Sequence, residues 1–200
     1  MAEPITFYFD IASPYAYLAS QRIDGIAARH GRTVDWRAIL LGPAMKLNGG
    51  RPVNVTPMRA AYAREDLARL ARIWGIAFVE PPNLPIFALR PSRAFYWALE
   101  AEGPEAARRM AQALFNAHFG RGEDIQEEDQ TLDVAEAAGF DRSALAKGLT
   151  DQRIKGRLRA ETDASMARGV FGAPWVIADG RNYWGADRLD ILDRVLAEGG

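Results

Sequence analysis

The sequence predicts an α/β fold in which strands at both ends of the chain enclose a long block of helices. Short apolar runs of strand character lie near the start, at residues 5–10 and 33–38, and near the end, at residues 175–185. The roughly 130 residues between them carry helical periodicity with proline-rich breaks. The 200 residues are 48% hydrophobic and 26% charged, which suits one compact domain, or one domain with a large insertion.

The first forty residues predict a β-α-β unit. Ile5–Asp10 is an apolar, aromatic run that ends at a turn, as a buried strand does. Ser13 follows as a helix N-cap with Pro14 at the first helical position, and apolar residues then recur every three or four positions until Gly31 ends this single helix. Thr33–Ala38 alternates polar and apolar residues and predicts a second strand, parallel to the first.

The middle of the chain has the pattern of an all-helical block. Residues 41–57 are rich in Gly, Pro and Asn, so we expect an irregular connection there. The acidic run at residues 122–130 is expected to be a solvated loop that leads into a helix. The predicted helices are Met58–Trp74, Pro91–Glu102, Glu105–Phe119, Thr131–Ala138, Ser143–Leu149 and Asp151–Arg168.

The end of the chain returns to strand character. Residues 175–179 and 182–185 are β-prone, Asp179-Gly180 between them is a hairpin signal, and Asp187 is expected to cap a last amphipathic helix. The complete order, β-α-β, helical block, β-β-α, is that of a thioredoxin-like fold with a large all-helical insertion. We therefore expect residues 1–40 and 170–200 to form a thioredoxin-like domain, and residues 41–169 to form the helical insertion with its connecting loops.

Composition argues against several kinds of site and partner. The chain has no cysteine, which excludes disulfides, thiolate metal sites and a cysteine nucleophile. With only two histidines, no metal site and no Ser–His–Asp triad is predicted. The net charge of −1 gives no field to attract nucleic acid or an anionic membrane. Neither a leader peptide nor a membrane-spanning apolar run is visible, so we expect a cytoplasmic location.

Two local features carry candidate chemistry. Ser13 begins a helix directly after a strand, where helix N–H groups and the dipole favour an anion such as a thiolate, and its hydroxyl can donate a hydrogen bond to sulfur. Helix capping alone also explains this serine, and both interpretations stay open. The second feature is Ala173-Pro174 directly before a strand. A cis bond there would present the backbone of Ala173 to an extended, peptide-like ligand.

Three segments in order carry a resemblance to a known family. They are SPYAYLA at residues 13–19, GVFGAPWVI at 169–177 and YWGADRLD at 183–190. In these segments, and over essentially its whole length, the chain resembles the glutathione-dependent 2-hydroxychromene-2-carboxylate isomerases and the kappa-class glutathione transferases, which have a DsbA-like thioredoxin fold with a helical insertion. The resemblance implies glutathione as the cofactor and a homodimer as the assembly.

The resemblance also implies roles for individual residues. Ser13 matches the serine that hydrogen-bonds the glutathione sulfur, where redox relatives carry a cysteine. Ala173 and the cis-proline Pro174 match the pair whose backbone meets the cysteinyl unit of glutathione. Ala186 and Asp187 match the pair that binds the γ-glutamyl end, where a carboxylate can pair with the ligand's ammonium group.

Other candidate residues, some matched to the family and some not, leave alternatives open. Asp66 corresponds to a carboxylate near the glutathione site, and a solvated helix acid is the alternative. An expected asparagine contact falls on Asn48 or Asn54, or is absent, because the loop between them departs from the family pattern. Arg90 and Arg93 are candidates to hold a substrate carboxylate, with surface ion pairing as the alternative. His30, His118 and the aromatic run at residues 95–97 are expected to be structural.

The sequence therefore predicts a glutathione-dependent cis–trans or ring-opening isomerase of the 2-hydroxychromene-2-carboxylate type, acting in aromatic compound catabolism. In this hypothesis Ser13 stabilises the glutathione thiolate, which adds transiently to a conjugated carbon, allows rotation about the resulting single bond and then leaves. The small-molecule partner is an aromatic-derived carboxylate. Two alternatives stay open: a kappa-like transferase that conjugates glutathione to electrophiles, and a non-catalytic thioredoxin-fold binding protein.

Overall fold

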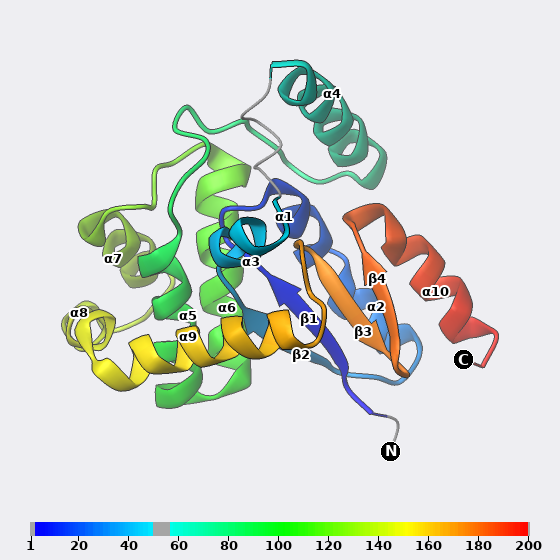
Figure 1. Ribbon diagram of the computed structural model, residues 1–200. Helices are drawn as coiled ribbons and strands as arrows, with labels where there is room; N and C mark the ends of the chain where they lie inside the picture. The colour runs from blue at the N-terminus through cyan, green and yellow to red at the C-terminus, as the bar shows by residue number, and fades with distance from the viewer. Residues whose placement is uncertain (1–2, 50–56, 200) are drawn as a thin grey trace.

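A four-stranded sheet of order β2-β1-β3-β4 forms the centre of the computed structural model, which describes residues 3–49 and 57–199 (Figure 1). The central strand β1 pairs in parallel with β2 and antiparallel with β3, and β3 pairs antiparallel with β4. This is the strand order that the thioredoxin-like prediction requires. The strands are β1 (Ile5–Phe9), β2 (Val34–Ala38), β3 (Trp175–Ala178) and β4 (Arg181–Trp184).

The helical block between β2 and β3 agrees with the six predicted helices to within a few residues. Its acidic entry segment is confirmed as a loop that leads into α7 through a capping box formed by Glu127 and Gln130. The helices are α1 (Pro14–Ser20), α2 (Ile23–Arg29), α3 (Leu41–Asn48), α4 (Pro57–Trp74), α5 (Leu89–Glu102), α6 (Pro104–Phe115), α7 (Glu128–Ala137), α8 (Arg142–Thr150), α9 (Gln152–Ala167) and α10 (Leu189–Ala197), with a π-helical turn at Asn116–Gly120.

The main core lies on one face of the sheet. Phe7 and Phe9 of β1 point to this face and meet Trp36 of β2 edge-on, with ring centroids 5.0 and 5.4 Å away. Phe95 of α5 packs edge-on against Phe9, and the neighbouring Tyr96 hydroxyl donates to the Ala38 carbonyl. The structural interpretation of the aromatic run in α5 is confirmed, because these rings hold the helical block against the sheet.

The opposite face of the sheet carries a smaller cluster. Tyr8 of β1 and Trp175 of β3 pack there against Ile39, Leu41 and Val170. These partners come from the start of α3 and from the segment that leaves α9, so this face joins α3 to the turn that precedes β3. The expected division into residues 1–40 plus 170–200 and residues 41–169 stays a prediction.

The helix expected over residues 14–31 is two helices, so that prediction is wrong in detail. The break falls at Gln21 and Arg22, between α1 and α2. The Ser20 hydroxyl donates to the Tyr17 carbonyl at 2.6 Å, and the Arg22 N–H turns back to the Ala19 carbonyl. A serine hydroxyl that bonds a backbone carbonyl of its own helix competes with the regular helical hydrogen bonds. The spacing of apolar residues gives no sign of this competition.

The irregular connection expected over residues 41–57 is wrong for its first half, because residues 41–48 form α3. The first N–H groups of this helix find partners that are distant in sequence. The Leu41 N–H donates to the Asp10 carboxylate at 2.7 Å, and the Leu40 N–H donates to the Thr162 hydroxyl at 3.2 Å. The helix start is therefore capped by the tertiary structure rather than by a local residue.

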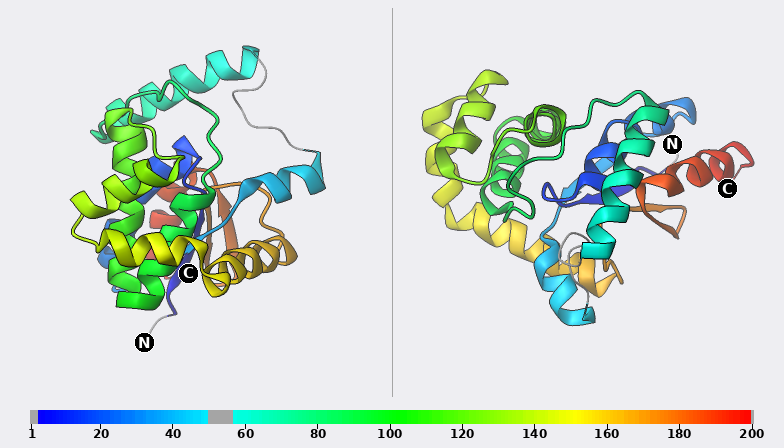
Figure 2. Two further views of the ribbon diagram at one scale, coloured as in Figure 1. Left: turned by 90° about the vertical axis from the view of Figure 1, so that its left-hand side faces the viewer. Right: turned by 90° about the horizontal axis from the view of Figure 1, so that it is seen from above.

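Helix α4 lies across α1 at one edge of the molecule (Figure 1 and Figure 2). Only Ala63, Leu67 and Ala71 of its side chains are buried. At its end, the Arg22 guanidinium stacks 4.1 Å from the centre of the Trp74 ring. Among the described helices, none is both long enough and apolar enough to cross a bilayer.

Candidate functional site

The candidate site begins in the loop that joins β1 to α1. Ser13 caps α1: its Oγ accepts from the Ala16 N–H at 3.2 Å, and its own N–H donates to the Asp10 carbonyl at 2.9 Å. Pro14 occupies the first helical position, where its missing N–H leaves no donor unpaired. The predicted cap is confirmed, and only 7% of Ser13 is exposed.

Ser13 also contacts the distant end of the chain. Its Oγ donates to the Ala173 carbonyl oxygen at 3.0 Å, across 160 positions of sequence. The two residues meet because β1 and β3 are antiparallel neighbours, with Tyr8 opposite Trp175. The Ala173–Pro174 peptide bond is cis. A hydroxyl has a single proton, so the bond to Ala173 uses the donor that a ligand sulfur would need.

An aromatic cluster packs against the outside of this turn. Phe171 meets Trp175 and Trp184 edge-on, with ring centroids 4.7 Å apart in both pairs. The Trp184 indole lies so close to Gly172 that a Cβ there would fall 2.3 Å from the indole Nε1. Only glycine fits beneath this ring, which ties the conformation of the turn to β4.

Ala186 and Asp187 follow β4 in a 3-10 turn, Ala186–Arg188, that contacts α1. The expectation that Asp187 caps the last helix is wrong, because the N-cap of α10 is Arg188. The 3-10 turn places Asp187 inside helical backbone, and the turn itself begins at Gly185, whose φ of 113° favours glycine. The Asp187 side chain is 56% exposed and makes no capping bond.

Tyr15, in the first turn of α1, joins this cluster to α4. Its hydroxyl donates to Asp66 Oδ2 at 3.0 Å, and Arg69 pairs with the other oxygen of that carboxylate at 3.0 Å. Burial raises the pKa of the Tyr15 hydroxyl, and the negative charges of Asp66 and Asp187 raise it further. Tyr15 therefore stays protonated as a donor, and both carboxylates lie on its side of α1.

Asp10 is a buried carboxyl group whose role the sequence pattern did not predict. Its Oδ1 accepts from the Ala12 N–H at 2.8 Å and its Oδ2 from the Leu41 N–H at 2.7 Å. Burial raises its pKa to about 6, and the two backbone hydrogen bonds oppose this shift. Asp10 ties the Ser13 loop to the start of α3. An acid at the end of an apolar strand, three residues before a helix cap, is the signal that points to it.

The family model of the DSBA-like thioredoxin domain matches residues 4–197. Over 199 residues the chain is 34% identical to a Pseudomonas putida protein named 2-hydroxychromene-2-carboxylate isomerase, covering 96% of this chain and 93% of that one. The chain belongs to the DSBA-like thioredoxin family, in the group that contains these isomerases.

Two further proteins are similar to this chain over nearly its whole length. A solved structure of a 2-hydroxychromene-2-carboxylate isomerase superposes with a TM-score of 0.88 at 31% identity, covering 97% of this chain and 94% of that one. A Caenorhabditis elegans protein named glutathione S-transferase kappa 1 is 26% identical, covering 97% of this chain and 91% of that protein. The resemblance derived from the three sequence motifs is confirmed.

For the remaining candidates of this DSBA-like protein, the described contacts do not include Ser13. Asn48 ends α3, and Asn54 lies outside the described residues. Arg90 pairs with Glu127 at 3.2 Å, so its expected surface pairing is confirmed. The Arg93 guanidinium donates to the Leu149 carbonyl at 3.3 Å.

Both histidines have structural contacts in this DSBA-like protein. His30 Nε2 lies 2.7 Å from Asp193 Oδ1, which joins α2 to α10. His118 is fully buried, with its Nδ1 against the Glu123 carbonyl, and burial lowers its pKa. Within residues 3–49 and 57–199, no group of three acidic or histidine side chains is placed to hold a metal ion.

Proposed function

We propose that this protein is a glutathione-dependent isomerase that acts on a 2-hydroxychromene-2-carboxylate or a similar aromatic-derived carboxylate. The observation that carries the proposal is the meeting of the Ser13 hydroxyl and the Ala173 carbonyl at a cis-proline turn. This pair combines a donor for a sulfur anion with a backbone acceptor for a peptide N–H. Membership of a group of isomerases and glutathione transferases supports an enzymatic role.

The fit to glutathione is supported by groups that match its parts. The Ser13 hydroxyl would donate to the sulfur and the Ala173 carbonyl would accept from the cysteinyl N–H, each giving up its present bond to the other. The exposed Asp187 carboxylate would pair with the γ-glutamyl ammonium, beside the backbone of Ala186, and Asp66 would add a second negative charge. Pro174 holds the turn, and Asn48 or Asn54 would supply an amide contact.

Bound glutathione supplies a thiol that can add to a conjugated carbon, open a double bond to rotation and leave unchanged. The chain's own contribution is electrostatic and geometric. A hydrogen bond from Ser13 favours the ionised sulfur, because it stabilises the charged form more than the neutral one. With α1 only seven residues long, we expect Ser13 itself to carry more of this stabilisation than the helix dipole.

The alternative within the same group is a kappa-like transferase that leaves glutathione attached to an electrophile. Ser13 would serve either reaction. The isomerase is favoured because identity to the Pseudomonas putida isomerase is 34%, against 26% to the kappa transferase. The proposal includes a cytoplasmic location, where glutathione is kept reduced, a homodimeric assembly and a place in aromatic compound catabolism.

A binding measurement followed by two assays tests the proposal. Calorimetric titration with glutathione is expected to give a saturable isotherm at millimolar ligand or below. Absorbance changes of 2-hydroxychromene-2-carboxylate are then compared with conjugation of 1-chloro-2,4-dinitrobenzene. Turnover of the first without net consumption of glutathione supports the isomerase. Conjugation alone indicates the transferase, and absence of glutathione binding overturns both and leaves the non-catalytic binding protein.

A further inference from the structure

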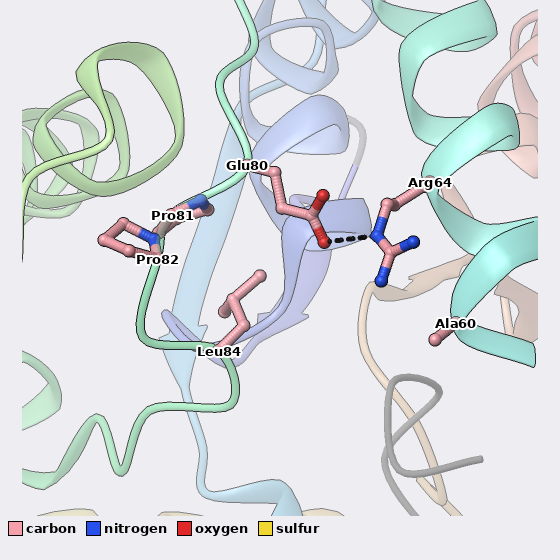
Figure 3. A pocket seen from close by; sticks show the side chains of 6 residues that line it. All are labelled: Ala60, Arg64, Glu80, Pro81, Pro82 and Leu84. Carbon is pink, nitrogen blue, oxygen red and sulfur yellow. Dashed lines mark hydrogen bonds and ion pairs between the residues drawn. The ribbon is translucent and has the colours of Figure 1, made fainter. Parts of the chain in front are cut away.

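A cavity of about 400 Å³ lies between α4 and the proline-rich segment that follows it (Figure 3). Ala60 and Arg64 line it from α4, and Glu80, Pro81, Pro82 and Leu84 line it from the facing segment. Its size suits a small organic molecule of one or two rings. None of the residues assigned above to glutathione lines this cavity.

Four of the six lining residues are apolar, and the other two, Arg64 and Glu80, form an ion pair. The proline rings, Leu84 and the Ala60 methyl group offer flat, non-polar surface, on which an aromatic ring can lie. Arg64 is the positively charged group of the lining. An open pocket with apolar proline and leucine surface beside a guanidinium suits a planar aromatic acid, because the ring can lie on the apolar surface while its carboxylate pairs with Arg64.

Glu80 contacts only the Nε of Arg64, so the two terminal nitrogens of the guanidinium can still donate to a ligand. Its Nε lies 3.0 Å from Glu80 Oε1, across the mouth of the cavity. Figure 3 shows one terminal nitrogen turned away from Glu80 and the other beside the Nε that contacts Glu80. In the described part of the chain, no hydrogen bond or ion pair is formed by these two nitrogens. Glu80 thus orients the guanidinium by one edge, and the remaining pair of donors has the fork geometry that binds a carboxylate bidentately.

Both walls of the cavity are hydrogen-bonded to α1, the helix that Ser13 caps. The Tyr15 hydroxyl donates a hydrogen bond to Asp66, which lies two residues after Arg64 on α4. The Tyr17 hydroxyl bonds the Ala77 carbonyl at 2.5 Å, three residues before Glu80 on the facing segment. The two tyrosines of one helix therefore set the spacing of the cavity walls relative to the Ser13 loop.

We infer that Arg64 is the residue that binds the substrate carboxylate, and that the cavity between α4 and residues 80–84 receives the aromatic part of the substrate. The inference rests on the proposed function for the identity of the substrate. It replaces Arg90 and Arg93 in that role. Arg90, like Arg64, forms one ion pair, and Arg93 donates to a backbone carbonyl of α8, but neither lines the cavity.

The test compares Arg64→Leu with Arg64→Lys and with the control Arg72→Leu, an exposed arginine two turns further along α4. For isomerisation, Arg64→Leu is expected to raise KM about ten- to a hundredfold, the range for losing hydrogen bonds to a charged group, with little change in kcat. Arg64→Lys is expected to recover part of the loss, because it keeps charge without the fork. Arg72→Leu is expected to match the wild type.

Two measurements that do not involve the substrate carboxylate separate its binding from a general disturbance of the site. Glutathione affinity and conjugation of 1-chloro-2,4-dinitrobenzene are expected to stay within about twofold of wild type in Arg64→Leu, since neither needs the substrate carboxylate. Equal KM values for wild type and Arg64→Leu would overturn the inference while leaving the isomerase in place.

A binding assay decides the inference even if the protein does not isomerise chromenes. Titration with 1-naphthoate, with 1-naphthamide as the neutral analogue, is expected to show weaker naphthoate binding in Arg64→Leu and no change for the amide. That result in a protein without isomerase turnover supports the cavity and refutes the proposed function. Naphthoate that binds both proteins equally, or binds neither, refutes the role of Arg64.

Discussion

The Ser13 hydroxyl donates to the Ala173 carbonyl oxygen at 3.0 Å. The two protein groups proposed to bind glutathione are therefore hydrogen-bonded to each other in this structure. A peptide-like thiol that binds here has to exchange this bond for two new ones. The exchange costs little, because one donor and one acceptor are released together and each finds a partner on the ligand. In the proposed complex with glutathione, this bond is replaced by bonds to the ligand.

Replacing Ser13 with alanine removes the proposed donor to sulfur. We expect Ser13→Ala to lose most turnover and to be destabilised by about 1–2 kcal/mol, because the cap of α1 and the bond to Ala173 are both lost. Ser20→Ala is the matched control, since it removes a buried hydroxyl at the other end of α1. Steady-state rates and urea unfolding measure both effects. Full activity in Ser13→Ala would refute the role.

Replacing Gly172 with alanine tests whether Trp184 fixes the cis-proline turn. A Cβ at Gly172 would meet the indole at 2.3 Å, so the ring or the turn has to move. We expect Gly172→Ala to weaken glutathione binding and to lower the melting temperature. Adding Trp184→Ala is expected to restore part of both losses, because it removes the atom that clashes.

The control for that experiment is Gly156→Ala. Gly156 lies inside α9 with nothing within 4 Å of an added Cβ, so alanine is expected to stabilise the helix by up to about 1 kcal/mol. Equal effects of alanine at the two glycines would show that the indole does not constrain the turn. Calorimetric unfolding and glutathione titration supply the comparison.

Replacing Tyr15 with phenylalanine removes the hydrogen bond that ties α4 to α1. Because few side chains of α4 are buried, we expect Tyr15→Phe to increase hydrogen exchange over residues 57–74 and to cost about 1 kcal/mol. Tyr17→Phe is expected to affect residues 76–80 instead, where its partner carbonyl lies. Unchanged exchange in α4 would show that Asp66 and Arg69 hold this helix without Tyr15.

Replacing Asp10 with asparagine is expected to change how stability depends on pH. The folded pKa of about 6 lies above the unfolded value of 3.8, so the native state binds more protons between these values. The contribution of Asp10 to stability therefore grows as pH falls through 6. Relative to Asp10→Asn, we expect the wild type to gain about 1 kcal/mol between pH 8 and pH 5.

Urea unfolding of both proteins at the two pH values measures this difference. His118 has the opposite sign, because its pKa is lowered by burial and its unfolded form takes up a proton below about pH 6.5. Its contribution is the same in both proteins and cancels. A wild type that loses stability relative to Asp10→Asn on acidification would contradict the raised pKa.

The sequence alone determined the features that depend on neighbouring residues. Strand and helix periodicity located the four strands and the helical block, the Ser13-Pro14 pair located the start of α1, and Asp179-Gly180 located the hairpin. These signals are local because backbone preferences and side-chain faces repeat within a few residues. Motif order also identified the family, since such motifs keep their spacing when the rest of the chain varies.

The tertiary structure alone decided the contacts between segments that are distant in the chain. The α3 start depends on Asp10, the placement of α4 depends on Tyr15 and Asp66, and the cavity around Arg64 depends on a facing segment. Each joins a side chain to a partner that the local pattern does not specify. Ser13 belongs to both groups: its cap was readable from the sequence, and its bond to Ala173 exists only because β1 and β3 are neighbours in the sheet.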